Sequence, residues 1–173
     1  DLPPSDVLML DVSPSIAVDI LGDRLPSRVA RAYRRYRHGP GAFKVDFAVE
    51  SGVPWTNPAA GRAGTVDVAG AFAELAAAKA DLHAGPMPER PFALVGQQYL
   101  ADPQRYMGNI HPVWTFAHVP NGYSGDATAA IIGQIERFAP VFRERIVGQT
   151  RPDDNANGHI QPKLPGSDIM TGS

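Results

Sequence analysis

Lys44 and Asp46 are the residues whose types and spacing are most suggestive of chemistry. They stand two residues apart in the segment 43–49, where apolar side chains alternate with polar or small ones. That two-residue period is typical of a β-strand, so it places the ammonium and the carboxylate together on the face opposite the apolar one. There the pair can orient a polar group of a substrate or position a water molecule near a reacting carbon. It can also be a solvent-facing ion pair of little energetic worth. The spacing alone favours the solvent-facing ion pair and leaves the pocket as the alternative.

A second candidate group is a histidine among aromatic side chains. Trp114, Phe116 and His118 share one face of a predicted strand at 113–119, and His111 precedes them. A histidine in an apolar pocket can carry a proton or donate a hydrogen bond to a ligand. The alternative is a buried histidine with satisfied hydrogen bonds. Trp55, which follows the Lys44 strand, is a further candidate wall of a binding pocket.

Several other chemistries lack the residues they need. The chain has no cysteine, which excludes disulfides, thiolate metal sites and thiol nucleophiles. Its five histidines show no metal-binding spacing, and no serine stands in a Gly-x-Ser-x-Gly frame, so we predict no metal site and no serine hydrolase. No Gly-x-Gly-x-x-Gly follows a predicted strand, so that device for binding a dinucleotide is absent as well.

Length and charge narrow the class of protein. The 173 residues suffice for one domain with a hydrophobic core, and a net charge of −2 disfavours nucleic acid as a partner. The sequence contains no apolar run long enough to span a membrane and no export signal pattern, and it lacks cysteine, so we expect a cytoplasmic protein. Because the first residue is Asp1 and it opens in the middle of a pattern, we expect a processed chain, an excised domain or a fragment.

The elements that must position these residues follow from periodicity and from helix-capping signals. Together they predict an α+β domain at 1–150, with a mixed or antiparallel sheet and helices packed on one side, followed by an irregular tail at 151–173. The predicted strands are 7–10, 43–49, 65–68, 92–95 and 113–119, and the predicted helices are 14–21, 26–36, 71–83 and 127–138, with a further helical turn at 140–147.

A series of short motifs resembles the C-terminal, substrate-binding portion of FAD-dependent oxidoreductases of the phytoene dehydrogenase-like group. The resemblance covers about residues 5–150, and its specificity lies in the order of the motifs. They are RYRHGPGAFKVDFA at 35–48, VPW at 53–55, RAGTV at 62–66, HPVW at 111–114, HVP at 118–120 and QIERFAP at 134–140.

The resemblance implies a fold, a cofactor and roles for residues. It implies a sheet that covers the isoalloxazine ring, an apolar substrate of the isoprenoid type, and hydride transfer to FAD. It also implies that Lys44 holds a water molecule near the flavin, as the catalytic residue, and that the substrate-binding residues line a pocket. These are Asp46, Trp55, Trp114, Phe116 and His118.

Two departures from the family pattern limit what this chain does alone. Thr65-Val-Asp67-Val-Ala69-Gly70 stands where the family has Thr-Val-His-x-Gly-Gly, and Asn155-Ala-Asn157 lacks the glycine-rich flavin motif that usually follows. We therefore expect no tight binding of FAD and no activity unless the flavin-binding domain is supplied.

Two alternatives to a portion of an oxidoreductase remain open. One is a non-catalytic module that binds an apolar ligand or interacts with another chain, and the other is a truncated product with no activity. The predicted partners are an apolar small molecule and the missing flavin-binding domain, with peripheral membrane contact and homo-oligomer formation as further predicted interactions.

Overall fold

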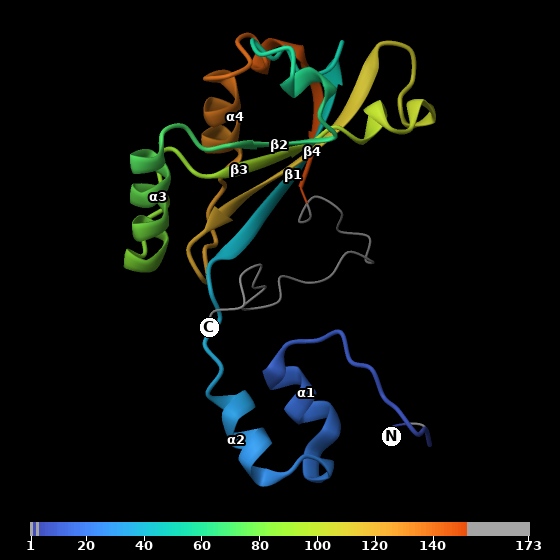
Figure 1. The fold of residues 1–173 in the computed structure, drawn as a ribbon, viewed down its shortest axis with the longest axis vertical. Helices are drawn as coiled ribbons and strands as arrows, with labels where there is room; N and C mark the ends of the chain where they lie inside the picture. Colours follow the sequence, from blue (N-terminus) through green and yellow to red (C-terminus); the bar gives the residue numbers. More distant parts are fainter. Residues whose placement is uncertain (1, 3, 152–173) are drawn as a thin grey trace.

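A five-stranded antiparallel sheet forms the centre of the fold (Figure 1). The computed structural model describes residue 2 and residues 4–151, so the predicted tail lies outside the described residues except for Arg151. The strands follow the order β2-β3-β4-β1-β5 across the sheet. Their bounds are β1 Gly41–Glu50, β2 Thr65–Val68, β3 Ala93–Gly96, β4 Ile110–Val119 and β5 Ile146–Thr150.

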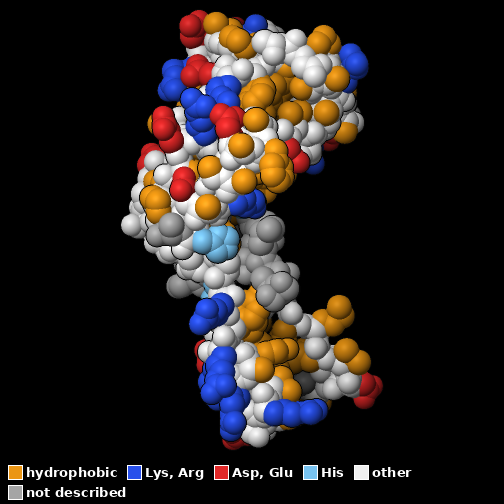
Figure 2. Space-filling model, turned by 60° about the vertical axis from the view of Figure 1, so that its left-hand side comes forward, with side chains coloured by type: hydrophobic (Ala, Val, Ile, Leu, Met, Phe, Trp, Pro, Cys, Tyr) orange, Lys and Arg blue, Asp and Glu red, His pale blue; other side chains and the backbone are white. Residues whose placement is uncertain are grey.

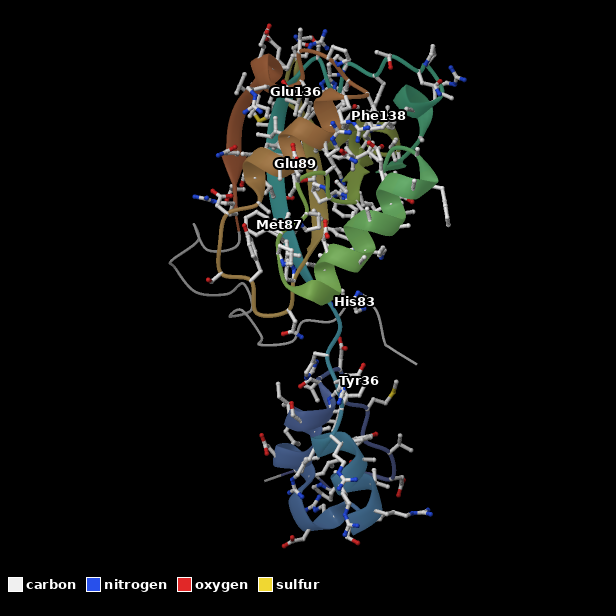
Figure 3. All side chains as sticks on the ribbon, turned by 90° about the vertical axis from the view of Figure 1, so that its left-hand side faces the viewer. Tyr36, His83, Met87, Glu89, Glu136 and Phe138 are labelled. Atoms are coloured by element: carbon white, nitrogen blue, oxygen red, sulfur yellow. The ribbon has the colours of Figure 1, made fainter. Side chains whose placement is uncertain are left out.

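Two helices contact this sheet, one on its core face and one through the Phe92 and His118 side chains, and two further helices form a separate hairpin (Figure 1). Their bounds are α1 Pro14–Leu21, α2 Ser27–Arg34, α3 Phe72–Ala84 and α4 Thr128–Glu136. Figure 3, viewed from the helical side, shows α3 and α4 in front of the strands. An ion pair between Glu74 of α3 and Arg137 just after α4 joins the two helices. The predicted α+β class with an antiparallel sheet is confirmed.

The hydrophobic core lies between the sheet and α4. β1 alternates as predicted, and Val45, Phe47 and Val49 are buried. These side chains pack with Ile131 and Ile135 of α4 in one continuous cluster. Burial of this branched and aromatic surface supplies the main drive for folding of the sheet unit. It also fixes the register, because a shift of one residue would turn the apolar face of β1 outward.

The α1–α2 hairpin is built from local signals. Ser13 caps α1 by accepting a hydrogen bond from the Ile16 N–H, and Pro14 occupies the first turn. Gly22 ends the helix with a positive φ of 51°. The helices pack mainly on each other, and residues 35–40 connect them to β1 (Figure 3, near Tyr36).

Arginine side chains cover the outer face of α2. Those of Arg28, Arg31, Arg34 and Arg35 are exposed, and none forms an ion pair with a described residue. A helical period of 100° per residue places these four within an arc of about 120°. Figure 2 shows the resulting column of positive charge on the hairpin, beside an apolar surface.

Two sequence predictions about secondary structure are wrong. The segment 7–10 is not a strand, and Val7 and Met9 are 76% and 91% exposed, because the apolar run finds no neighbouring strand among the described residues. The predicted helical turn at 140–147 is instead a short 3-10 helix at Arg143–Arg145 followed by β5. β5 was missed because a short edge strand with few buried residues carries a weak pattern.

Candidate ligand-binding face of the sheet

The face of the sheet turned away from the core brings together five of the six predicted site residues. In the β1–β4 register Lys44 lies opposite Phe116, and Asp46 lies opposite Trp114. His118 lies opposite Ala42 and shares this face through the alternation of β4. We call this surface the aromatic face, and it consists of Lys44, Asp46, Phe92, Leu94, Gly96, Trp114, Phe116 and His118.

Four rings form a continuous row on the aromatic face. The Trp114 and Phe116 rings are nearly parallel, with centroids 5.9 Å apart and an interplanar angle of 16°. The Phe116 and His118 centroids are 6.0 Å apart. His118 then stacks on Phe92 with centroids 5.2 Å apart and an angle of 18°. From Trp114 to His118 the row extends about 13 Å along β4 at the usual rise per residue.

Gly96 allows the indole of Trp114 to lie against the sheet. The two residues are paired across β3 and β4. A Cβ atom at position 96 would lie 2.0 Å from the Trp114 Nε1 atom and 2.1 Å from its Cε2 atom. Any larger residue would therefore displace the ring. The Nε1 atom is buried and has no hydrogen-bond partner among the described residues.

Lys44 and Asp46 form an ion pair beside the rings. The Lys44 Nζ atom lies 2.5 Å from the Asp46 Oδ2 atom, and the two side chains are 49% and 40% exposed. An exposed pair of this kind contributes little to stability. The position of the pair fits both interpretations of the sequence. The pair is solvent-accessible, as a surface ion pair would be, and it also borders the aromatic row, where it could contact a ligand.

His118 is buried and neutral. It is 6% exposed, and its Nδ1 atom lies 3.3 Å from the Nζ atom of Lys79, which extends from α3. Because a lysine ammonium only donates, Nδ1 acts as the acceptor and the ring proton resides on Nε2. Burial, and secondly the charge of Lys79, lower the pKa of His118. This arrangement corresponds to the interpretation of a buried, hydrogen-bonded histidine.

Trp55 does not belong to the aromatic face. It packs against the hydrophobic core cluster on the other side of the sheet. Its Nε1–H donates to the Gln97 Oε1 atom over 2.9 Å, and the Tyr99 hydroxyl donates to the same oxygen. The fully buried Gln97 also donates to the backbone oxygens of Ala60 and Ala63, so this network fixes the loop after β1. The structure thus gives Trp55 a role in packing rather than a place beside Trp114.

Sequence reasoning missed two members of the site. Phe92 was assigned only to a strand, yet its ring extends the aromatic row. Lys79 falls within the predicted helix at 71–83, at helical spacing from Leu75 and Leu82, and its Nζ atom lies 5.9 Å from the Phe92 ring centroid. A lysine within an apolar helical stripe is the signal that could have singled it out.

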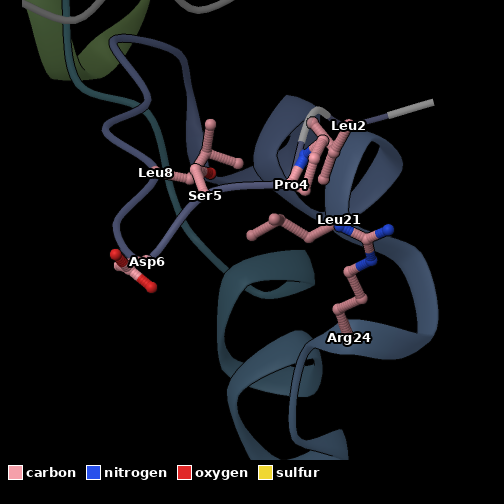
Figure 4. A pocket seen from close by; sticks show the side chains of 7 residues that line it. All are labelled: Leu2, Pro4, Ser5, Asp6, Leu8, Leu21 and Arg24. Carbon is pink, nitrogen blue, oxygen red and sulfur yellow. The ribbon is translucent and has the colours of Figure 1, made fainter.

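A separate hollow lies in the N-terminal hairpin (Figure 4). It has a volume of about 430 Å³ and is lined by apolar residues with one serine, one aspartate and one arginine. Its lining is Leu2, Pro4, Ser5, Asp6, Leu8, Leu21 and Arg24. None of the predicted site residues contributes to it, so it offers no support for a role in the predicted chemistry.

The described residues contain no group of three residues able to hold a metal ion, and none of their helices is long and apolar enough to cross a membrane. The aromatic face offers rings for a flat or conjugated molecule. The sequence contains no Gly-x-Gly-x-x-Gly turn between a strand and a helix, the usual device for binding a diphosphate.

A scan against protein-family models found no match, and a search of curated proteins found no significant match.

Proposed function

We propose that this chain is the substrate-binding portion of an FAD-dependent oxidoreductase of the phytoene dehydrogenase-like type. In this proposal the aromatic face contacts an apolar, conjugated substrate of the isoprenoid type. The observation that carries the proposal is the continuous row of four rings from Trp114 to Phe92 on the face opposite the core. The family assignment rests on the order of the sequence motifs.

The row suits an elongated apolar ligand for physical reasons. Aromatic side chains provide large apolar areas at a low cost in conformational entropy, and flat π-systems stack favourably on them. Trp114 and Phe116 are partly exposed, so a ligand would remove their remaining apolar surface from water. Gly96 leaves the indole room to lie flat on the sheet.

The flavin would come from segments that bind the nucleotide, supplied as a separate domain. When bound, it accepts a hydride from the substrate. The residues of this chain would bind and orient the substrate and exclude water from the aromatic row. Lys44, 49% exposed and close to Phe116 in the register, keeps its proposed role of holding a water molecule.

Retinol, an apolar conjugated isoprenoid, tests the binding role directly. Added to the 173-residue chain, it should quench tryptophan emission in a saturable way. Measured by the fluorescence of retinol itself, which does not depend on either tryptophan, the Trp114→Leu variant should bind retinol more weakly, whereas the matched Trp55→Phe variant should bind it as the native chain does. An absence of saturable binding, or an equal loss in both variants, would contradict the proposal.

A parallel titration with FAD tests the cofactor. We expect weak binding or none by the chain alone. Tight binding with a shifted flavin spectrum would show that the chain is competent to hold the cofactor without a further domain. In the enzyme complete with its flavin-binding domain, Lys44→Met should slow flavin reduction, and an unchanged rate would remove Lys44 from the mechanism.

The alternative is a binding module without catalytic function. It shares the aromatic face, so retinol binding does not separate it from an oxidoreductase. Reading the coding sequence upstream of Asp1 for a strand–Gly-x-Gly-x-x-Gly–helix unit does, because only the oxidoreductase needs a nucleotide-binding segment.

Location and further contacts are also part of the proposal. The absence of cysteine suits a reducing cytoplasmic compartment. The arginine-covered face of α2 supports peripheral contact with an anionic membrane, and the partly exposed rings support self-association.

A further inference from the structure

Lys79 stands out among the cations of the sheet unit. Its Nζ atom contacts the Nδ1 atom of His118 at 3.3 Å, and its side chain is partly buried. No carboxylate of a described residue lies within ion-pair distance of it. By contrast, Arg90 and Arg137 both bind Glu74. Lys79 therefore carries a positive charge that the described part of the chain leaves without a counter-ion.

The Lys79 ammonium also has more N–H donors than its described contacts use. A lysine Nζ carries three N–H groups, and the neutral His118 ring accepts only one of them. Burial of the charged group without further acceptors is costly, so an oxygen from outside the described chain would be stabilising there. A carboxylate meets both needs, because it supplies the negative charge and strong acceptor atoms.

Lys79 lies at one end of the aromatic row. Ring contacts lead from Trp114 through Phe116 to His118 and Phe92. The Lys79 Nζ atom lies over the Phe92 ring, 5.9 Å from its centroid, and contacts His118 as well. The surface is thus apolar along about 13 Å and positive at its end.

We propose that the aromatic face binds an amphipathic acid, with an elongated apolar or conjugated body along the ring row and a carboxylate on the Lys79 ammonium. This inference rests on the proposed function, since it names the chemical class of the ligand for the same face. It adds a polar recognition site at one end of that face, with Lys79 as the residue that selects the acid.

Retinoic acid and retinol provide a matched pair of probes. They share the conjugated isoprenoid body and differ in the head group, a carboxylate in one and a hydroxyl in the other. Dissociation constants from quenching of tryptophan emission should favour retinoic acid about fivefold, the size of a partly solvated ion pair. The preference should shrink as salt concentration rises.

Variants then assign the preference to one side chain. Lys79→Met should remove the preference, so that retinoic acid and retinol bind with equal affinity, and Lys79→Arg should retain it because the charge is kept. Arg62→Met, which removes an exposed cation outside the aromatic face, should preserve the full preference. Thermal unfolding of each variant verifies that it is folded.

The outcomes separate the two proposals. If the native chain binds both probes equally, or if Lys79→Met keeps the preference, the acid site is wrong while the apolar binding face stands. If neither probe binds, both the acid site and the proposed function of the face fail.

Discussion

Replacement of Gly96 by alanine tests whether the aromatic face depends on close approach between β3 and the Trp114 ring. The added Cβ atom would lie 2.0, 2.1 and 2.7 Å from three atoms of the indole. Real Cβ atoms do not approach ring atoms so closely, and all three belong to a rigid ring. The indole must therefore leave its position on the sheet, or the strands must separate.

The loss in free energy of unfolding follows from the packing and ring contacts that the displaced indole loses. Overpacking a well-packed site typically costs about 1–3 kcal/mol. The stack of Trp114 on Phe116 contributes about 0.5–1.5 kcal/mol beyond burial of area. We expect Gly96→Ala to lower the free energy of unfolding by about 2 kcal/mol.

Urea unfolding measures this change, and tryptophan emission reports the movement of the ring. Gly64→Ala is the matched control, because a Cβ atom at position 64 meets nothing within 4 Å. The control should change the unfolding free energy by less than about 0.5 kcal/mol. In the Trp114→Ala background Gly96→Ala should cost almost nothing, since the clash is gone. A loss of about 2 kcal/mol in that background as well would refute the reasoning.

Three further measurements probe other parts of the fold. Burial lowers the pKa of His118, so the unfolded chain binds its proton more readily, and the free energy of unfolding should fall as pH drops through about 6.5. His118→Asn should reduce that slope in urea titrations between about pH 8 and 5.5, and an unchanged slope would contradict the assignment. Hydrogen bonds from Arg137, and secondly from Arg90, lower the pKa of Glu74 from 4.5 to about 2. The stability that Glu74 contributes is thus present above pH 4.5 and is lost as pH falls toward 2, and acid titrations of Glu74→Gln should lack this loss. Phe142 is fully buried and packs edge-on against Phe47, so Phe142→Ala should cost about 3–5 kcal/mol in urea unfolding, and a cost below about 1 kcal/mol would place it outside the core.

The elements that sequence reasoning located well are those with strong local signals. The alternation around Val45 predicts β1, and Ser13 with Gly22 marks both ends of α1. The prediction of a strand at 7–10 was wrong because an apolar run becomes a strand only when another strand pairs with it. Pairing is a property of the tertiary structure. β5 was missed for the same reason. It is a strand because its backbone pairs with β1, and its own side chains carry little signal of that pairing.

The same distinction between local signals and tertiary contacts applies to the candidate site. Alternation within a strand was enough to put Trp114 with His118, and Lys44 with Asp46. Which residues of β1 lie beside which residues of β4 depends on the register between the two strands. That register joins segments 70 residues apart in the sequence, for example through the hydrogen bond that the Thr115 hydroxyl donates to the Val45 backbone oxygen. Lys79 joins the site only through the packing of α3 against the sheet, which no local pattern specifies.

The separation of the α1–α2 hairpin from the sheet has a consequence for how the chain loses its structure. Ala17, Val18 and Ala30 are buried within the hairpin, yet none belongs to the core cluster of the sheet. A unit with so small an apolar core opens at a lower free energy than the sheet does. Backbone amides of α1 and α2 should therefore exchange with deuterium sooner than those in the centre of β1 and β4. Unfolding of the whole chain should then depart from a single cooperative transition, with the hairpin as the first part to melt.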